Sequence, residues 1–114
     1  MKAKIELTNP LGKEIINVEN IIDRNHFFYE DNDNARNEVS IFDNGIDIKR
    51  NSNTHSTFLS LKENENSFVS ITSREGNLIF NAKVLELNTN NDIITLVYKV
   101  EEDTNSIIIN YLGV

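Results

Sequence analysis

Apolar and polar residues alternate along most of this chain with a period of two residues, which is the pattern of a β-strand with one buried face. Close to the start of the chain, Ala3, Ile5 and Leu7 alternate with polar neighbours. The segment 91–100 shows the same alternation near the end of the chain. No window of the sequence shows the spacing of an amphipathic helix, so the pattern predicts an all-β protein.

The segment 91–100 is the strand around which the rest of the chain is organised. We expect it to be the penultimate strand of a meander, with 78–87 before it and 107–112 after it. One face of this strand should be buried in the core. The residues on that face are Ile94, Leu96, Tyr98 and Val100.

Short polar segments separate the alternating segments and predict tight turns. Pro10 and Gly12 lie in the first of them, where proline presets φ and glycine tolerates a positive φ. Asp43-Asn44-Gly45 is the strongest hairpin signal, because Asn-Gly favours a type I′ turn. The pattern predicts about nine short strands joined by consecutive hairpins, and therefore an antiparallel meander.

Two segments change their apolar face partway along, as strands do where a sheet bends. We expect Lys13–Arg24 to be one long strand with a bulge near Glu19-Asn20. Leu85 breaks the alternation of the strand 78–87 in the same way. Long strands that bend are typical of a barrel, whose strands must coil to close. The sequence therefore predicts a single domain, residues 1–114, in which one antiparallel meander closes into a small β-barrel; a flat sandwich is the alternative.

Three short motifs resemble the YwiB-like proteins, an uncharacterised bacterial family of calycin-type, lipocalin-like β-barrels. Ile46–Arg50 resembles that family's apolar strand ending in arginine, and Thr72–Leu78 its glycine-containing turn before a long strand. Leu96–Val100 resembles its penultimate strand with a central tyrosine. A glycine expected after the arginine is replaced here by Asn51-Ser52. The resemblance implies a barrel of about eight to ten strands and implies no particular reaction.

The composition excludes several kinds of partner and of chemistry. The formal net charge is −7, which argues against binding to nucleic acid or to an anionic membrane surface. The chain has no cysteine, which excludes disulfides and thiolate chemistry. No apolar run has the length of a membrane span and the first residues lack an apolar signal segment, so we expect a cytoplasmic protein.

Motifs that carry catalysis or hold a metal or cofactor are not recognisable in the sequence. His26 and His55 lie far apart and lack the spacing of metal ligands. The polar segment Glu30–Asn34 superficially resembles a calcium loop but lacks its glycine and terminal glutamate. Phe27–Tyr29 could stack on nucleic-acid bases, but in an acidic protein core packing is the better interpretation. We therefore expect no catalytic residues, no metal and no cofactor.

Three functions remain open at the level of sequence. The first is binding of a small apolar or amphipathic ligand in the barrel interior, by analogy with the calycin shape. The alternative is a non-catalytic structural or protein-interaction module whose barrel is filled by its own side chains. An enzyme ranks last, because no catalytic constellation is visible.

Arg50 and Tyr98 are the candidate ligand-binding residues. Arg50 shares one strand face with Ile46 and Ile48, so its guanidinium should follow two core residues inward. Tyr98 follows Leu96 inward in the same way. If both residues border one cavity, Arg50 could hold an anionic or polar head group with paired donors and Tyr98 with its hydroxyl. The alternative is that Arg50 lies in solvent or forms a structural ion pair with a carboxylate.

Overall fold

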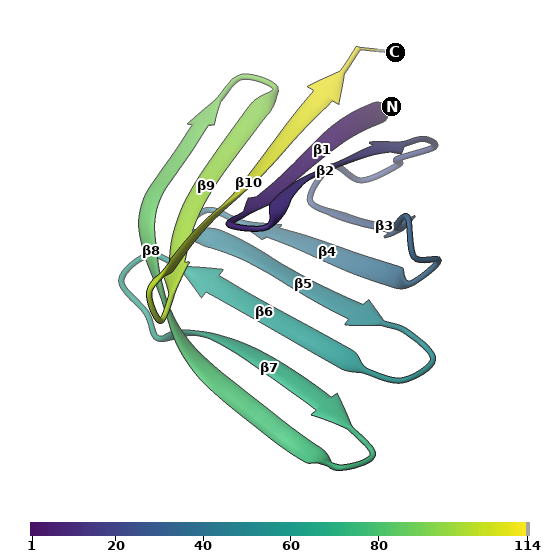
Figure 1. The fold of residues 1–114 in the computed structure, drawn as a ribbon. Helices are drawn as coiled ribbons and strands as arrows, with labels where there is room; N and C mark the ends of the chain where they lie inside the picture. Colours follow the sequence, from purple (N-terminus) through teal and green to yellow (C-terminus); the bar gives the residue numbers. More distant parts are fainter. Residues whose placement is uncertain (114) are drawn as a thin grey trace.

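A computed structural model of the chain describes residues 1–113, and every regular element in that part of the chain is a β-strand. There are ten strands (Figure 1). Their bounds are β1 Lys2–Asn9, β2 Gly12–Val18, β3 His26–Glu30, β4 Arg36–Phe42, β5 Gly45–Asn51, β6 Ser56–Lys62, β7 Ser67–Ser73, β8 Gly76–Asn90, β9 Ile93–Val100 and β10 Asp103–Leu112. The prediction of an all-β protein is confirmed.

All ten strands belong to one antiparallel sheet in the order β2-β1-β10-β9-β8-β7-β6-β5-β4-β3. Each strand from β3 to β9 pairs with the next one along the chain, as the hairpin turns require. The first strand, β1, pairs with both β2 and β10, so the beginning and the end of the described chain share the sheet. The predicted meander is confirmed.

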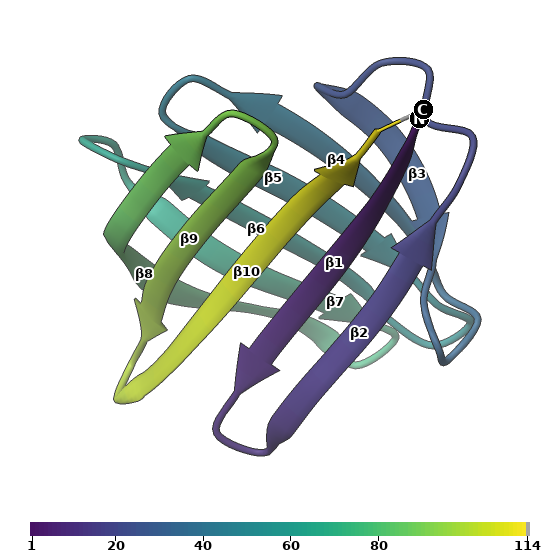
Figure 2. The same cartoon turned by 90° about the horizontal axis from the view of Figure 1, so that it is seen from above.

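The sheet curls into a nearly closed barrel. In Figure 2, β8, β9, β10, β1 and β2 form one wall, and β3 to β7 form the wall that faces it. The seam lies between β2 and β3, which are the two edges of the sheet and are not paired with one another. The apolar core lies between the walls and is built from the inward-facing residues of nearly all strands. It includes Ile5, Ile16, Val39, Ile46, Leu61, Leu96, Ile107 and Ile109.

The connection between β2 and β3 closes one end of the barrel. We expected the second strand to continue through this segment to Arg24, but β2 ends at Val18. Asn20 has a φ of 59°, which a strand does not accommodate. Ile21 then exchanges backbone hydrogen bonds with Met1 and buries its side chain in the core. The prediction of a bulged strand over Lys13–Arg24 is therefore wrong, because this segment covers the barrel end instead.

The hairpin β4–β5 forms at Asp43-Asn44-Gly45 as expected, but its turn is not of type I′. Asp43 and Asn44 are the loop residues, and neither has the positive φ that a type I′ turn requires. Gly45 is needed for another reason. A Cβ atom at this position would lie 1.9 Å from the carbonyl oxygen of Leu61, so only glycine lets β5 approach β6 this closely.

The long strand β8 joins the two walls, because its first half pairs with β7 and its second half with β9. The register shifts between Val84 and Glu86, which confirms the predicted irregularity at Leu85. Such a bulge bends the strand and increases its twist. The first half of β8, Gly76–Asn81, has no partner on its second side within the described chain.

Candidate functional site

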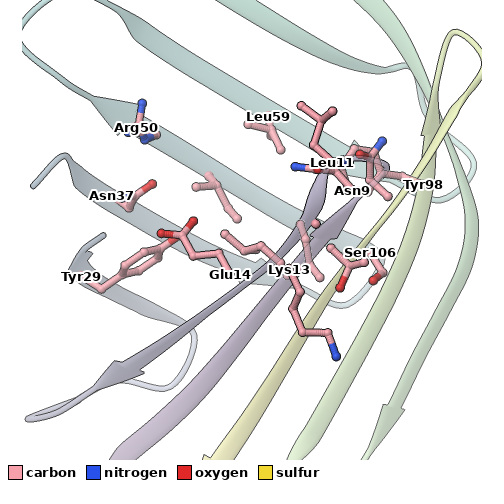
Figure 3. Close-up of a pocket in the computed structure, with 16 residues that line it drawn as sticks. Asn9, Leu11, Lys13, Glu14, Tyr29, Asn37, Arg50, Leu59, Tyr98 and Ser106 are labelled. Atoms are coloured by element: carbon pink, nitrogen blue, oxygen red, sulfur yellow. Dashed lines mark hydrogen bonds between the residues drawn. The ribbon is translucent and has the colours of Figure 1, made fainter. Parts of the chain in front are cut away.

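The end of the barrel opposite the 19–25 connection contains a cavity of about 410 Å³ (Figure 3). Residues of β1 to β6, β9 and β10 line it, together with the β1–β2 turn. Its apolar lining comes from inward-facing strand residues. These are Leu7, Ile48, Leu59 and Ile107.

Arg50 and Tyr98 both line this cavity. Figure 3 shows Arg50 on the same side as Asn37, Tyr29 and Glu14, with Tyr98 across the opening from them. Both side chains point inward because they continue the buried faces of β5 and β9, as the alternation of each strand requires. The two residues therefore border one shared space from opposite walls.

The guanidinium of Arg50 is already engaged by the protein. Its Nε atom donates to Oδ2 of Asp31 at 2.7 Å, and its Nη2 atom lies 3.6 Å from Oδ2 of Asp33. The Asp31 side chain is almost fully buried, whereas that of Asp33 is exposed. The contact with Asp31 raises the pKa of Arg50, although burial opposes this. Arg50 thus forms the ion pair that we considered at the level of sequence, and it lines the cavity as well.

The loop between β3 and β4 wraps around the Asp31 carboxylate. Oδ1 of Asp31 accepts hydrogen bonds from the main-chain N–H groups of Asp33 and Ala35 at 3.0 and 3.1 Å, while Oδ2 accepts from the Asn37 amide at 3.0 Å. Burial disfavours the charged form, but the hydrogen bonds from Arg50, Asn37 and the main chain outweigh it and lower the pKa of Asp31 to about 2. This network fixes the position of the Arg50 guanidinium.

Two tyrosine side chains, Tyr29 and Tyr98, line the cavity. Within residues 1–113, neither the Tyr29 nor the Tyr98 hydroxyl has a hydrogen-bond partner in the protein. Burial raises the pKa of Tyr98, and burial together with the charges of Asp31 and Glu14 raises that of Tyr29. Both side chains therefore stay neutral and can donate or accept a hydrogen bond at physiological pH.

Like Arg50, Glu14 is a charged residue that faces the cavity. It shares the inner face of β2 with Ile16 and Val18, both of which are buried. Its Oε2 atom accepts a hydrogen bond from the main-chain N–H of Asn32 at 3.3 Å, and this contact bridges the seam between the two sheet edges. The neighbouring Lys13 side chain projects away from Glu14 and Arg50 (Figure 3).

Sequence reasoning missed Glu14, Tyr29, Asp31 and Asn37 as members of this site. The alternation of β2 contains a signal for Glu14, since the residue stands two positions before Ile16. The signal for Asp31 is its position at the start of a polar loop. An aspartate there commonly accepts a hydrogen bond from the main-chain N–H two residues later. Tyr29 was placed in the core, and its ring is indeed buried.

Neither histidine belongs to the cavity lining. Nε2 of His26 lies 2.7 Å from Oε2 of Glu38 on the outer surface, and the hydrogen bond from His26 lowers the pKa of Glu38. Nδ1 of His55 contacts the Thr54 hydroxyl at 2.7 Å. Among residues 1–113, no three His, Asp or Glu side chains are grouped closely enough to hold a metal ion. Nor does any helix in the described chain have the length and apolar character needed to cross a membrane.

Comparison with known proteins identifies a shared fold. No known protein family and no curated protein matches the sequence. The structure is similar to the crystal structure of the ywiB protein from Bacillus subtilis, with a TM-score of 0.58 over 98% of this chain and 89% of that chain. The two sequences are 11% identical, so the similarity shows that the chain has the same barrel fold as that protein.

Proposed function

We propose that this protein is a non-catalytic binding protein that holds a small apolar or amphipathic molecule in the open end of its barrel. The proposal includes membership of the YwiB-like proteins and a calycin-type mode of binding, in which the ligand enters through the end of the barrel. The shared fold with the ywiB protein and the sequence motifs at Ile46–Arg50 and Leu96–Val100 support this relationship.

One observation carries the proposal: Arg50 and Tyr98 line the same cavity of about 410 Å³. This volume is in the range of small-molecule sites, which combine an apolar lining with a few polar groups that orient the ligand. Here Ile48, Leu59 and Ile107 provide apolar contacts. The hydroxyls of Tyr29 and Tyr98 and the charged side chains at the cavity are the groups that could orient a ligand.

A structural or protein-interaction role is the second candidate. The ion pairs of Arg50 with Asp31 and Asp33 favour this role, because they stabilise the β3–β4 loop whether or not a ligand is present. The hairpin β7–β8 also exposes two apolar side chains, Leu78 at 60% and Ile79 at 64%. As neighbours on one strand they point to opposite faces of β8, and large exposed apolar side chains are typical of surfaces that contact another protein.

A cavity-filling variant distinguishes the two candidates. Leu59 lines the cavity and Ile22 is fully exposed at the opposite end, so Leu59→Trp should fill the site while Ile22→Trp should not. We expect octanol, octanoate or octylamine to raise the melting temperature of the wild type and of Ile22→Trp, and to have no effect on Leu59→Trp. If none of the three compounds shifts the wild type, or if Leu59→Trp responds equally, the ligand-binding proposal is wrong and the interaction role is favoured.

A further inference from the structure

The charged side chains at the cavity decide which kind of head group it accepts. Arg50 and Glu14 line the cavity with opposite charges, and the negative Asp31 and Asp33 contact Arg50 without lining the cavity themselves. Lys13 borders the cavity, but its amine points away from Glu14 and Arg50 (Figure 3). The cluster around the guanidinium is therefore negative overall, which raises the local concentration of cations and repels anions.

Arg50 is poorly available to an anionic head group. Its Nε atom is taken up by Asp31, which approaches to 2.7 Å, and Asp33 stands 3.6 Å from Nη2. Paired recognition of a carboxylate needs two parallel N–H donors on one edge of the guanidinium. An anion at the remaining Nη1–Nη2 edge of Arg50 would lie close to the carboxylates that already surround the guanidinium.

Glu14 forms no close ion pair among residues 1–113, and Arg50, whose charge it feels, is paired with Asp31 instead. Its carboxylate accepts a single hydrogen bond, from the Asn32 main chain, and keeps unused acceptor capacity toward the cavity. A half-buried carboxylate at a cavity wall is a strong partner for a ligand cation, because water screens the pair less than at the open surface. The Tyr29 ring beside it adds an aromatic surface that favours a cation.

We propose that the ligand is an amphipathic amine whose ammonium group pairs with Glu14 while its apolar part packs against Ile48, Leu59 and Ile107. This inference rests on the proposed function and defines the ligand class for that same site. The Tyr29 hydroxyl oxygen, on the same side of the cavity as Glu14, can accept a further hydrogen bond from the ammonium group. The role of Arg50 is then to hold the loop around Asp31 in place, rather than to bind the ligand's head group.

Three probes with the same chain length test the inference by calorimetric titration of the full protein. Octylamine, octanol and octanoate each contain eight carbon atoms and carry a cationic, a neutral and an anionic head group, respectively. We expect octylamine to bind at least about tenfold more tightly than octanol and octanoate to bind most weakly. Glu14→Gln should remove the advantage of the amine and leave the affinity for octanol nearly unchanged.

Glu86→Gln is the matched control, because it removes the same charge from an exposed position on β8 that does not line the cavity. This variant should bind octylamine as the wild type does. Equal losses in both variants would mean that general charge attraction, and not Glu14, selects the amine, and would overturn the inference. Octanoate binding as tightly as octylamine would overturn it too, while leaving the proposed function intact. Binding of none of the probes would instead refute the proposed function itself.

Glu14→Asp provides a second measurement that does not depend on how well Glu14→Gln folds. It keeps the charge but shortens the side chain, so we expect it to retain a preference for octylamine over octanol. Loss of that preference in Glu14→Asp, with the fold intact by circular dichroism, would contradict charge pairing at this position.

Discussion

The hydroxyl of Tyr111 on β10 donates a hydrogen bond to the main-chain carbonyl oxygen of Arg24, and the Arg24 guanidinium lies 4.4 Å from the centre of the Tyr111 ring. Arg24 also contacts Asp92 in the β8–β9 turn at 3.4 Å. These contacts fasten the 19–25 connection to the wall formed by β8, β9, β10, β1 and β2. The closed end is therefore held by specific polar contacts as well as by the burial of Ile21.

Tyr111→Phe should lower the free energy of unfolding by about 1 kcal/mol, because it removes the hydroxyl and leaves the Arg24 carbonyl without its partner. Urea unfolding measures the effect. Tyr98→Phe is the matched control, since the Tyr98 hydroxyl has no partner in the described protein, and it should change stability by less than about 0.5 kcal/mol. Equal losses in the two variants would mean that the contact with Arg24 contributes nothing specific.

Leu96→Ala should lower the free energy of unfolding by about 2–5 kcal/mol, because a fully buried leucine leaves a cavity when it is truncated. Leu96 has 0% exposure at the centre of β9, whereas Leu11 has 98% exposure in the first turn. Leu11→Ala should therefore cost less than about 0.5 kcal/mol in the same urea experiment. A loss below that value for Leu96→Ala would contradict the position of this side chain in the core.

The Asp31 carboxyl should make stability depend on pH in the acid range. Its pKa is lowered from an ordinary value of 3.8 to about 2 in the folded protein, so the unfolded chain takes up the proton first as the pH falls. The stabilisation from this group is complete above its unfolded pKa and is lost as the pH falls toward the folded value. Asp31→Asn should thus destabilise the protein at neutral pH, and much less near the folded pKa.

Urea unfolding of the wild type and Asp31→Asn at neutral and acid pH measures this difference. Asp103→Asn is the control, because the Asp103 side chain is exposed and forms no ion pair within the described chain. Its effect should be small and nearly the same at both pH values. A constant difference between the wild type and Asp31→Asn across the acid range would contradict the role of the Arg50 and Asn37 hydrogen bonds.

Gly45→Ala should destabilise the protein by about 2 kcal/mol or more, because the new methyl group meets the Leu61 main chain, which cannot move without breaking the β5–β6 pairing. Gly113→Ala is the control, since a Cβ atom there has no neighbour within 4 Å. Thermal unfolding followed by circular dichroism compares the two. Similar melting temperatures for both variants would show that β5 and β6 can separate at little cost.

The hairpins and their faces could be predicted from the sequence because they depend on local signals. The alternation that places Leu96 inside and the phase break at Leu85 are both properties of adjacent residues. The segment after Val18 could not be predicted in this way. Its apolar residues continue a strand-like pattern, but Ile21 is buried by a contact with the start of β1 that no local rule contains.

The candidate site was predictable in part for the same reason. Alternation pointed Arg50 and Tyr98 inward, and the structure has both at one cavity. The partner of Arg50 was not predictable, because Asp31 lies 19 positions away and reaches Arg50 through the curvature of the sheet. Glu14 comes to the cavity only because β2 and β3 meet at the seam of the barrel.

The pairing of β1 with β10 has a consequence for how the chain folds. Every other strand pairing joins neighbours in the sequence, so those hairpins can form early from local contacts. The ladder from Lys2–Leu112 to Thr8–Ser106 needs both ends of the described chain and must close a long loop first. During synthesis, the β1 edge that faces β10 therefore has no partner until β10 has left the ribosome.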